Sequence, residues 1–283
     1  MKLLSYFFNG RARYGIVRDD GVIDLTARLG DQVPTLRDLL ALEDLGAAVD
    51  IAASASPDHA LGKIRYDLPV PNASKILCAG RNYRAYHEVI DDGKTPQYPS
   101  IFARHASSFA AHGENLLTSK VAEKLDYEGE LVAVISKPGR YIEAENALDH
   151  VAGYTIMNEG TMRDWMKIGT QNTPAKGFDC SGGLGPWMVT SDEIADPQKL
   201  HITTRRNGQV VQDGGTDMMI FDVAYLVQHI SKFTTLQPGD LITTGSPGGS
   251  IAEQEDPQWL SPGEELSVEI SGVGLLSNTV AEG

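Results

Sequence analysis

Two glutamates, Glu128 and Glu130, lie two residues apart in the apolar stretch LDYEGELVAVI, residues 125–135. The stretch predicts a buried β-strand, in which side chains at i and i+2 point to the same face. Two carboxylates placed side by side on an apolar strand repel each other, and their desolvation costs free energy. A bound cation would remove that repulsion and would explain why the pair, preceded by Asp126, is placed there.

A third carboxylate supports a cation site. Glu159 ends the apolar stretch that opens GYTIMNEGTMRD, residues 153–164, and therefore lies at a predicted strand terminus. Three carboxylates without a Cys or His cluster favour a hard divalent cation, Mg²⁺ or Mn²⁺, over zinc. A Glu-x-Glu pair on a strand is more often a solvated face, so the spacing alone leaves both interpretations open.

The elements that must position these residues are mostly strands. Residues 2–26 predict a meander with turns at Asn9-Gly10 and Asp20-Gly21, and residues 35–54 predict one or two short helices. Beyond residue 70 strands dominate, interrupted by an amphipathic helix within 221–236 and a short helix near 146–151. We expect an α+β, mainly β fold without βαβ alternation, which argues against Rossmann and TIM-barrel folds. It would comprise a small N-terminal α/β domain, residues 1–70, and a catalytic domain, residues 71–283.

Composition limits the possible partners. The 283 residues carry a formal net charge of −14, which argues against nucleic acid or an anionic membrane as a partner. Cys78 and Cys180 are far apart and fit free thiols in a reducing compartment. The sequence shows neither a signal-peptide pattern nor an apolar run near the ~20 residues of a transmembrane helix. We therefore expect a cytoplasmic protein.

From about residue 75 to 283 the sequence resembles the fumarylacetoacetate hydrolase family. The resemblance rests on an ordered set of segments: LCAGRNYRAYHE, IFARHASSF, LDYEGELVAVI, GYTIMNEGTMRD, TPAKGFD, GPWMVTSDEI, NGQVVQDGGTDMMIFDVAYLVQHIS, LQPGDLITTGSPGG and LSPGEELSVEISGVGLLSNTV. It implies a β-roll or mixed β-sandwich catalytic domain with few helices, a Mg²⁺ or Mn²⁺ site, a small-molecule keto-acid substrate and a homodimer.

The resemblance also implies roles for individual residues. Glu128 and Glu130 match the two glutamate ligands of the family, and Glu159 stands where the family most often has aspartate. Lys176, in PAKGF, matches a lysine that contacts the bound acid. Because Glu is one methylene longer than Asp, the third ligand must change its bite or its backbone position.

The family resemblance also implies a water-activating His-Glu dyad, but the spacing of these two residues in this sequence differs from that of the family. Members of the family carry a His four residues after the Asn of their Asn-Tyr pair and a Glu three residues later, whereas this sequence has His87 followed directly by Glu88. Adjacent residues of a helix diverge by about 100°, so the two cannot meet as residues at i and i+3 do. We retain His87 as candidate general base and Glu88 as a weak orienting group.

Other residues complete the predicted pocket. Arg81 and Arg104 are candidates for holding a substrate carboxylate through a planar fork. Arg163 and Asp164 predict a structural ion pair beneath the metal. The predicted substrate-binding residues are Arg81, Tyr83, Arg104, Thr216 and Ser246.

The resemblance and the metal chemistry together predict a hydrolase. It would cleave a carbon–carbon bond of a 2,4-dioxo acid of the acylpyruvate type, with the cation as Lewis acid, to give pyruvate and a second acid. The alternatives are a decarboxylase or isomerase of oxaloacetate-like or unsaturated dioxo acids, which the shifted His87–Glu88 spacing favours somewhat, and a non-catalytic relative that binds a keto acid.

Overall fold

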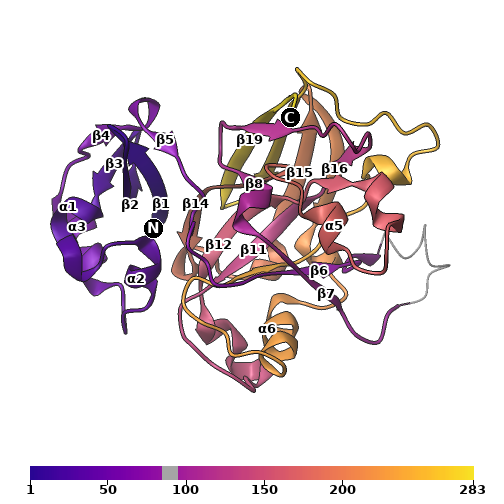
Figure 1. The fold of residues 1–283 in the computed structure, drawn as a ribbon. Helices are drawn as coiled ribbons and strands as arrows, with labels where there is room; N and C mark the ends of the chain where they lie inside the picture. Colours follow the sequence, from indigo (N-terminus) through magenta and orange to yellow (C-terminus); the bar gives the residue numbers. More distant parts are fainter. Residues whose placement is uncertain (85–94) are drawn as a thin grey trace.

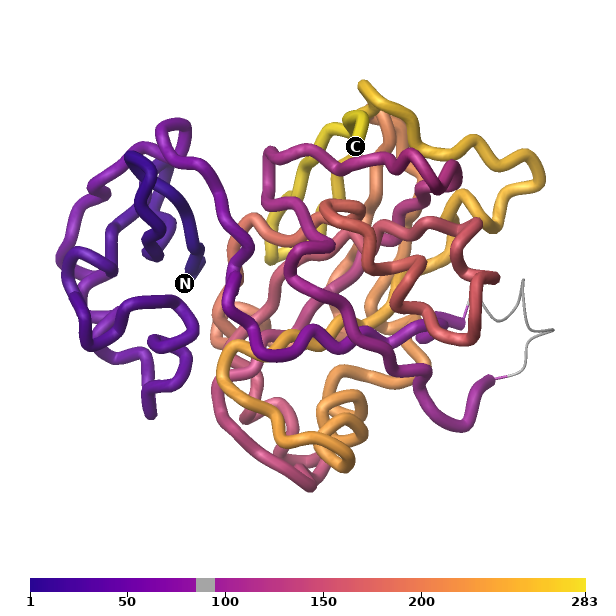
Figure 2. The backbone as a smooth tube through the Cα atoms, in the orientation of Figure 1, coloured from indigo at the N-terminus to yellow at the C-terminus, as the bar shows by residue number. Residues whose placement is uncertain are grey.

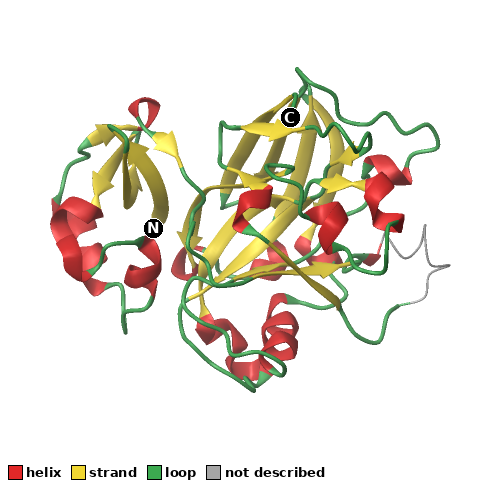
Figure 3. Cartoon of the chain, viewed as in Figure 1, coloured by secondary structure: helices red, strands yellow, loops and turns green. Residues whose placement is uncertain are grey.

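The computed structural model describes residues 1–84 and 95–283 (Figure 1). The N-terminus lies in a smaller lobe and the C-terminus in the larger one, as the backbone trace shows (Figure 2). Strands fill the middle of the larger lobe and helices lie at its periphery (Figure 3). In the described ranges, no helix is long and apolar enough to cross a bilayer.

The first 66 residues form the meander and the short helices that the sequence predicts. Asn9 and Gly10 take left-handed backbone angles, φ 49° and 74°, as a tight hairpin turn requires. Thr35 caps the second helix and forms a capping box with Asp38. The elements are β1 (Lys2–Phe8), β2 (Arg11–Arg18), β3 (Gly21–Asp24), α1 (Leu25–Leu29), α2 (Leu36–Leu40), α3 (Gly46–Ser54), β4 (His59–Ala60) and β5 (Arg65–Tyr66).

A large mixed sheet runs through both lobes. Its strand order is β4-β3-β2-β1-β14-β12-β11-β17-β6-β7, with β5 paired to β1 and β8 paired to β14. The two lobes meet at β1 and β14, which pair antiparallel through Lys2 with Val189 and Leu3 with Met188. The strands added by the larger lobe are β6 (Ile76–Gly80), β7 (Ser100–Arg104), β8 (Phe109–Ala110), β11 (Gly129–Ile135), β12 (Val151–Asn158), β14 (Gly182–Thr190) and β17 (Leu241–Thr243).

A second sheet packs against one face of the first. Its order is β16-β15-β18-β19-β9, and a hairpin turn at Asn207-Gly208 joins β15 to β16. The predicted amphipathic helix is α6, and the predicted short helix near 146–151 is a 3-10 segment, Ala144–His150. The remaining elements are β9 (Asn115–Leu117), β10 (Leu125–Asp126), β13 (Thr161–Met162), α5 (Thr173–Lys176), β15 (His201–Arg206), β16 (Gln209–Gly215), α6 (Val223–Ser231), β18 (Glu265–Ile270) and β19 (Gly274–Ala281).

Strand β11 is buried on both faces, which explains its continuous apolar sequence. Leu131, Ala133 and Ile135 face a core shared with the second sheet and α6. Val132 and Val134 face a second core, to which helices of the smaller lobe contribute. The two-residue period of a strand assigns alternate residues to the two cores. Because both faces of β11 pack in a core, the backbone position of the segment that carries Glu128 and Glu130 is fixed.

The sequence predicts a single strand over residues 125–135, but the structure divides this stretch between two strands. Leu125 and Asp126 belong to β10, which pairs with β13 in a separate two-stranded sheet, and β11 begins only at Gly129. Glu128 therefore lies at a bend between two strands, not on the same strand face as Glu130. Glycine is required at position 129, between the two glutamates, because a Cβ there would approach Thr204 Oγ1 of the second sheet to 2.4 Å.

The smaller lobe shares a core with the larger one. Leu3, Leu36 and Leu39 belong to the same apolar cluster as Leu184 and Met188 of β14. The side chain of Arg37 also donates from Nε to the carbonyl oxygen of Pro238 at 3.1 Å. Apolar burial therefore crosses residue 70, and the division of the chain into folding units at that residue stays a prediction.

Candidate active site

The three predicted carboxylates line one pocket of about 320 Å³ in the larger lobe. Glu128 comes from the bend before β11, Glu130 from β11 itself, and Glu159 from the residue after β12. Arg81 and Ser246 line the same pocket, and so does Lys176 at the end of α5. The structure thus brings together six of the predicted site residues from five separate segments.

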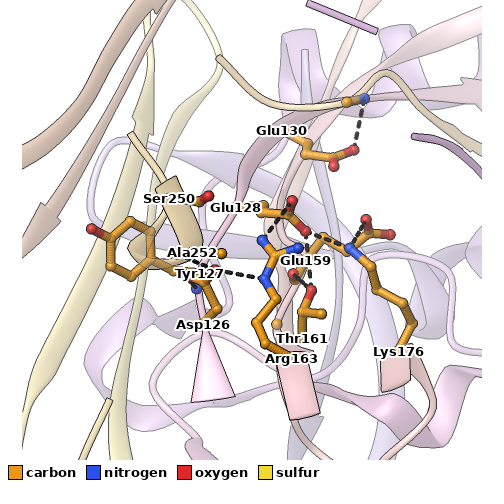
Figure 4. A network of polar contacts seen from close by, with 12 residues as sticks. Asp126, Tyr127, Glu128, Glu130, Glu159, Thr161, Arg163, Lys176, Ser250 and Ala252 are labelled. Atoms are coloured by element: carbon orange, nitrogen blue, oxygen red, sulfur yellow. Dashed lines mark hydrogen bonds and ion pairs between the residues drawn. The ribbon is translucent and has the colours of Figure 1, made fainter. Parts of the chain in front are cut away.

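Lys176 lies between two of the carboxylates (Figure 4). Its ammonium group donates to Glu159 Oε2 at 2.6 Å and to Glu128 Oε2. The side chains of Lys176 and Glu159 are almost completely buried, with 5% and 2% of their surface exposed. An ammonium group has three N–H donors, so one remains after these two contacts. Lys176 is therefore a fixed cation with a donor available to a ligand in the pocket.

Glu130 is held by the Gly-rich loop that follows β17. The amide of Gly245, with φ at +82°, donates to Glu130 Oε2 at 2.9 Å. The left-handed backbone at this position suits glycine, as the sequence GSPGG indicates. This hydrogen bond ties the first residue of the loop to a side chain of the pocket.

Arg163 forms hydrogen bonds to two carboxylates of the segment that precedes and begins β11. Its Nε donates to Asp126 Oδ2 at 2.7 Å and its NH2 donates to Glu128 Oε1 at 3.0 Å. The predicted partner, Asp164, instead accepts a hydrogen bond from the amide of Glu123 at 2.9 Å. Arg163 directly follows β13, the strand that pairs with β10, and the partner in the structure is therefore Asp126 of β10.

Charge and burial shift the pKa values of the site in opposite directions. Burial raises the pKa of Glu128, but Arg163 and Lys176 outweigh it and bring the pKa to about 2. Burial, together with repulsion by Glu159 and Glu128, holds the pKa of Glu130 well above its ordinary value. For Lys176 burial lowers the pKa, yet the attraction of Glu128 and Glu159 is larger and the net shift is upward. Lys176 is thus held in its charged form.

The donor chemistry of the pocket fits a divalent cation. Glu128, Glu130 and Glu159 supply carboxylate oxygens to a pocket that three cationic side chains, Arg81, Arg163 and Lys176, also line. Glu159 Oε1 is buried and has no hydrogen-bond partner within residues 1–84 and 95–283. In those ranges no three acidic, His or Cys side chains are already gathered around a common ion position. The residue types therefore fit Mg²⁺ or Mn²⁺, although Lys176 now lies between two of the carboxylates.

Arg104 and Thr216 do not line the pocket, contrary to the prediction. The guanidinium of Arg104 is 3% exposed and donates to Gly160 O at 3.0 Å, to Ser108 and to Ser181. Thr216 is buried, accepts from the amide of Leu200 at 2.9 Å and fixes the start of β15. Both side chains form hydrogen bonds to other segments of the fold, which the sequence around them does not reveal.

Tyr83 also lies away from the pocket lining. Its side chain is fully buried in the core between the sheets and α6, and its backbone bridges to Met219. The neighbouring Asn82 explains this placement, because its amide group bonds the backbone of Phe221 and the carbonyl oxygen of Thr244. His87 and Glu88 lie outside the described residues, so the predicted dyad stays a prediction.

Sequence reasoning missed two sets of residues at the site. Four apolar residues, Pro96, Tyr98, Phe102 and Met166, also line the pocket. Asp126 accepts a hydrogen bond from Arg163, which lines the pocket, but was given no role. The adjacent acid in LDYEGE was a usable signal for Asp126, whereas the sequence around the four apolar residues gave none.

Residues 75–281 match the family described as "Fumarylacetoacetate (FAA) hydrolase C-terminal". The chain belongs to this family. Membership in the fumarylacetoacetate hydrolase family confirms the resemblance inferred from the ordered segments and the mainly β fold. It also indicates that the protein is an enzyme, without fixing the reaction.

Similar proteins carry two kinds of name. An oxaloacetate tautomerase of Xenopus laevis, named as mitochondrial, is 36% identical over 274 residues, which cover 95% of this chain and 86% of the relative. An oxaloacetate tautomerase of Bacillus subtilis is 36% identical over 78% of this chain and 75% of its own length. A solved structure named fumarylacetoacetate hydrolase, from Exiguobacterium antarcticum, has a TM-score of 0.83 and 32% identity, with 100% of both chains covered.

Proposed function

We propose that this enzyme interconverts the keto and enol forms of an oxaloacetate-like 2-oxo acid. The observation that carries the proposal is the buried Lys176 ammonium, held by Glu128 and Glu159 in the carboxylate pocket. The two tautomerases at 36% identity support this reaction over carbon–carbon bond hydrolysis. We therefore propose the isomerase, which the sequence analysis gives as an alternative, in place of the predicted hydrolase.

Keto–enol conversion requires a proton to leave the carbon next to the carbonyl and a proton to reach the carbonyl oxygen. Negative charge develops on that oxygen as the carbon loses its proton. Lys176 offers the N–H that its two carboxylate contacts leave, and a fixed donor stabilises such a charge more than water does. Because Lys176 is 4% exposed, little solvent competes for this hydrogen bond.

We also propose that Glu128, Glu130 and Glu159 hold Mg²⁺ or Mn²⁺. The cation would supply Lewis-acid charge that favours the enolate. The three carboxylates that line one pocket and the Glu159 Oε1 atom, which has no hydrogen-bond partner in the described residues, support this proposal. Arg81, whose backbone takes the left-handed φ of 57°, lines the pocket and would attract a substrate carboxylate.

Hydrolysis of an acylpyruvate is the second candidate. The full-length similarity to a structure named fumarylacetoacetate hydrolase favours it. Hydrolysis needs a base that activates water, and the described lining of the pocket contains no imidazole. The predicted base His87 lies outside the described residues and would decide between the two reactions.

An assay with two substrates distinguishes the candidates. Enol oxaloacetate is added to the enzyme with Mg²⁺ or Mn²⁺, and loss of the enol is followed by ultraviolet absorbance while a lactate dehydrogenase coupling reports pyruvate. Accelerated enol loss without pyruvate supports tautomerisation. Pyruvate from oxaloacetate would identify a decarboxylase, and pyruvate from an acylpyruvate without enol conversion would identify a hydrolase. Light scattering of the same sample tests the predicted homodimer.

A further inference from the structure

Asp126 connects two walls of the pocket without lining it. Its side chain is completely buried and lies on β10, which belongs to the separate two-stranded sheet with β13. Oδ1 accepts from the amides of Tyr127 and Ile251, both at 2.8 Å, and Oδ2 accepts from Ala252 at 3.2 Å and from Arg163 Nε at 2.7 Å. Four donors from three segments therefore meet on one carboxylate (Figure 4).

One of these connections leads to the metal-binding carboxylates. Arg163 divides its guanidinium between Asp126 and Glu128, with the Nε edge on Asp126 and NH2 on Glu128 Oε1. Asp126 thereby fixes the side from which Arg163 approaches and leaves Glu128 Oε2 to its two other donors, Lys176 Nζ and Thr161 Oγ1. Without Asp126 the planar fork of Arg163 would be free to engage Glu128 with two donors, which would compete with a bound cation.

The other connection leads to the Gly-rich loop. Ile251 and Ala252 end the loop whose first residue, Gly245, bonds Glu130 and whose second, Ser246, lines the pocket. The hydroxyl of Tyr127 and the amide group of Gln212 bind the middle of the same loop, at Gly249 O and Pro247 O. Gln212 also accepts from the amide of Gly129, between the two glutamates. Hydrogen bonds from Asp126, Tyr127 and Gln212 thus hold the 245–252 loop next to the segment that carries the two glutamates.

We propose that Asp126 is a positioning residue that holds Arg163 and the 245–252 loop so that Glu128 and Glu130 present their oxygens to one divalent cation. The inference rests on the proposed cation site and extends it to a side chain that contacts neither substrate nor metal. Asp126 would orient the metal ligands through hydrogen bonds to other residues. Loss of such a residue commonly lowers metal affinity about 10- to 100-fold.

The test compares Asp126→Asn with a matched control, Asp240→Asn. Asp240 is also fully buried, accepts from the amides of Lys75 and Gln237, and pairs with Lys75 Nζ at 2.7 Å, but it does not line the pocket. Both variants lose one carboxylate charge and keep its shape. A loss of stability alone would affect the two similarly, so the readouts must report on the pocket.

Two readouts are used on the full chain. Mn²⁺ affinity, measured by the free-ion signal in electron paramagnetic resonance, should fall about tenfold or more in Asp126→Asn and stay near the wild-type value in Asp240→Asn. Amide hydrogen exchange should rise across residues 245–252 in Asp126→Asn but not in Asp240→Asn. Equal Mn²⁺ affinity in the two variants, or unchanged exchange in the loop, would overturn the positioning role. A wild-type enzyme that binds Mn²⁺ but leaves enol oxaloacetate unchanged would refute the proposed reaction and not this inference.

Discussion

At the scale of single residues, the site depends on how opposite charges share a small buried space. Lys176 contacts Glu128 and Glu159, and Arg163 contacts Glu128 and Asp126, so each cation lies between two carboxylates. Removing one partner of such a buried pair leaves the other uncompensated, which costs more than the pair contributes. The same arrangement keeps Lys176 charged and available as a donor.

Replacing Lys176 by Met tests its role as donor. We expect kcat for enol oxaloacetate to fall on the order of 10²- to 10³-fold, because the charge that develops on the substrate oxygen loses its fixed donor. Steady-state kinetics measures the change. Lys199→Met is the matched control, since the Lys199 side chain is 80% exposed and its pair with Asp196 lies on the surface. Turnover that survives in Lys176→Met would exclude Lys176 from the reaction.

At the scale of elements, the site depends on the contact between two sheets. Gly129 separates the two glutamates and lies against β15 and β18, where a Cβ would meet Thr204 Oγ1 at 2.4 Å and Val268 Cγ1 at 3.0 Å. Its amide donates to Gln212 Oε1 of β16 at 2.9 Å. The second sheet therefore sets the position of the carboxylates that the first sheet carries.

Replacing Gly129 by Ala should separate the sheets locally. We expect a loss of about 1–3 kcal/mol in the free energy of unfolding, typical of overpacking, and weaker cation binding. Denaturant titration with and without Mn²⁺ measures both. Gly62→Ala is the control, because a Cβ at Gly62 meets nothing within 4 Å. Equal midpoints for the two variants would show that the sheets tolerate the added methyl group.

Local patterns predicted the elements better than the site. The turn dipeptides and alternating apolar residues located β1, β2 and β3, and the amphipathic spacing located α6, because these signals are local. The break at Glu128 was not predictable, since nothing in the apolar stretch itself shows that Leu125 and Asp126 pair with β13 instead of continuing β11. Arg104 was misassigned for the same reason, because its acceptors Gly160 and Ser181 are distant in sequence.

The carboxylates themselves were predictable from types and spacing. Glu128 and Glu130 form an unusual pair in an apolar stretch, and Glu159 ends a strand, so all three could be placed at one site before their geometry was known. Asp164 was predicted as the partner of Arg163 because the two are adjacent in sequence, whereas Arg163 pairs with Asp126. Side-chain pairing across a bend is a tertiary property, and adjacency is a poor guide to it.

At the scale of the whole molecule, the two lobes share one sheet and one of the apolar cores. Strand β1 pairs with β14, and Leu3, Leu36 and Leu39 join the cluster that contains Val132 and Val134 of β11. The same β11 carries Glu130. Burial in the smaller lobe should therefore contribute to the stability of the strand that presents the site.

Replacing Leu39 by Ala tests this coupling. Leu39 is fully buried, and we expect a loss of about 2–5 kcal/mol that appears in the unfolding of the larger lobe. Trp165 and Trp259 pack in a core of the larger lobe, whereas Trp187 packs against the smaller lobe. Fluorescence measured in a Trp187→Phe background therefore reports the larger lobe. Leu42→Ala, at a position 44% exposed, is the control. A tryptophan transition that stays in place while far-ultraviolet circular dichroism shifts would indicate that the lobes unfold independently.

The central claim is that a divalent cation binds among Glu128, Glu130 and Glu159 and activates a 2-oxo acid there. The most direct measurement is the anomalous scattering of Mn²⁺ in crystals grown with oxalate, an analogue of an enolised 2-oxo acid. The account predicts one ion within coordination distance of all three carboxylates, with oxalate on its open side toward Lys176. An ion bound elsewhere, or oxalate bound in this pocket without an ion, would contradict it.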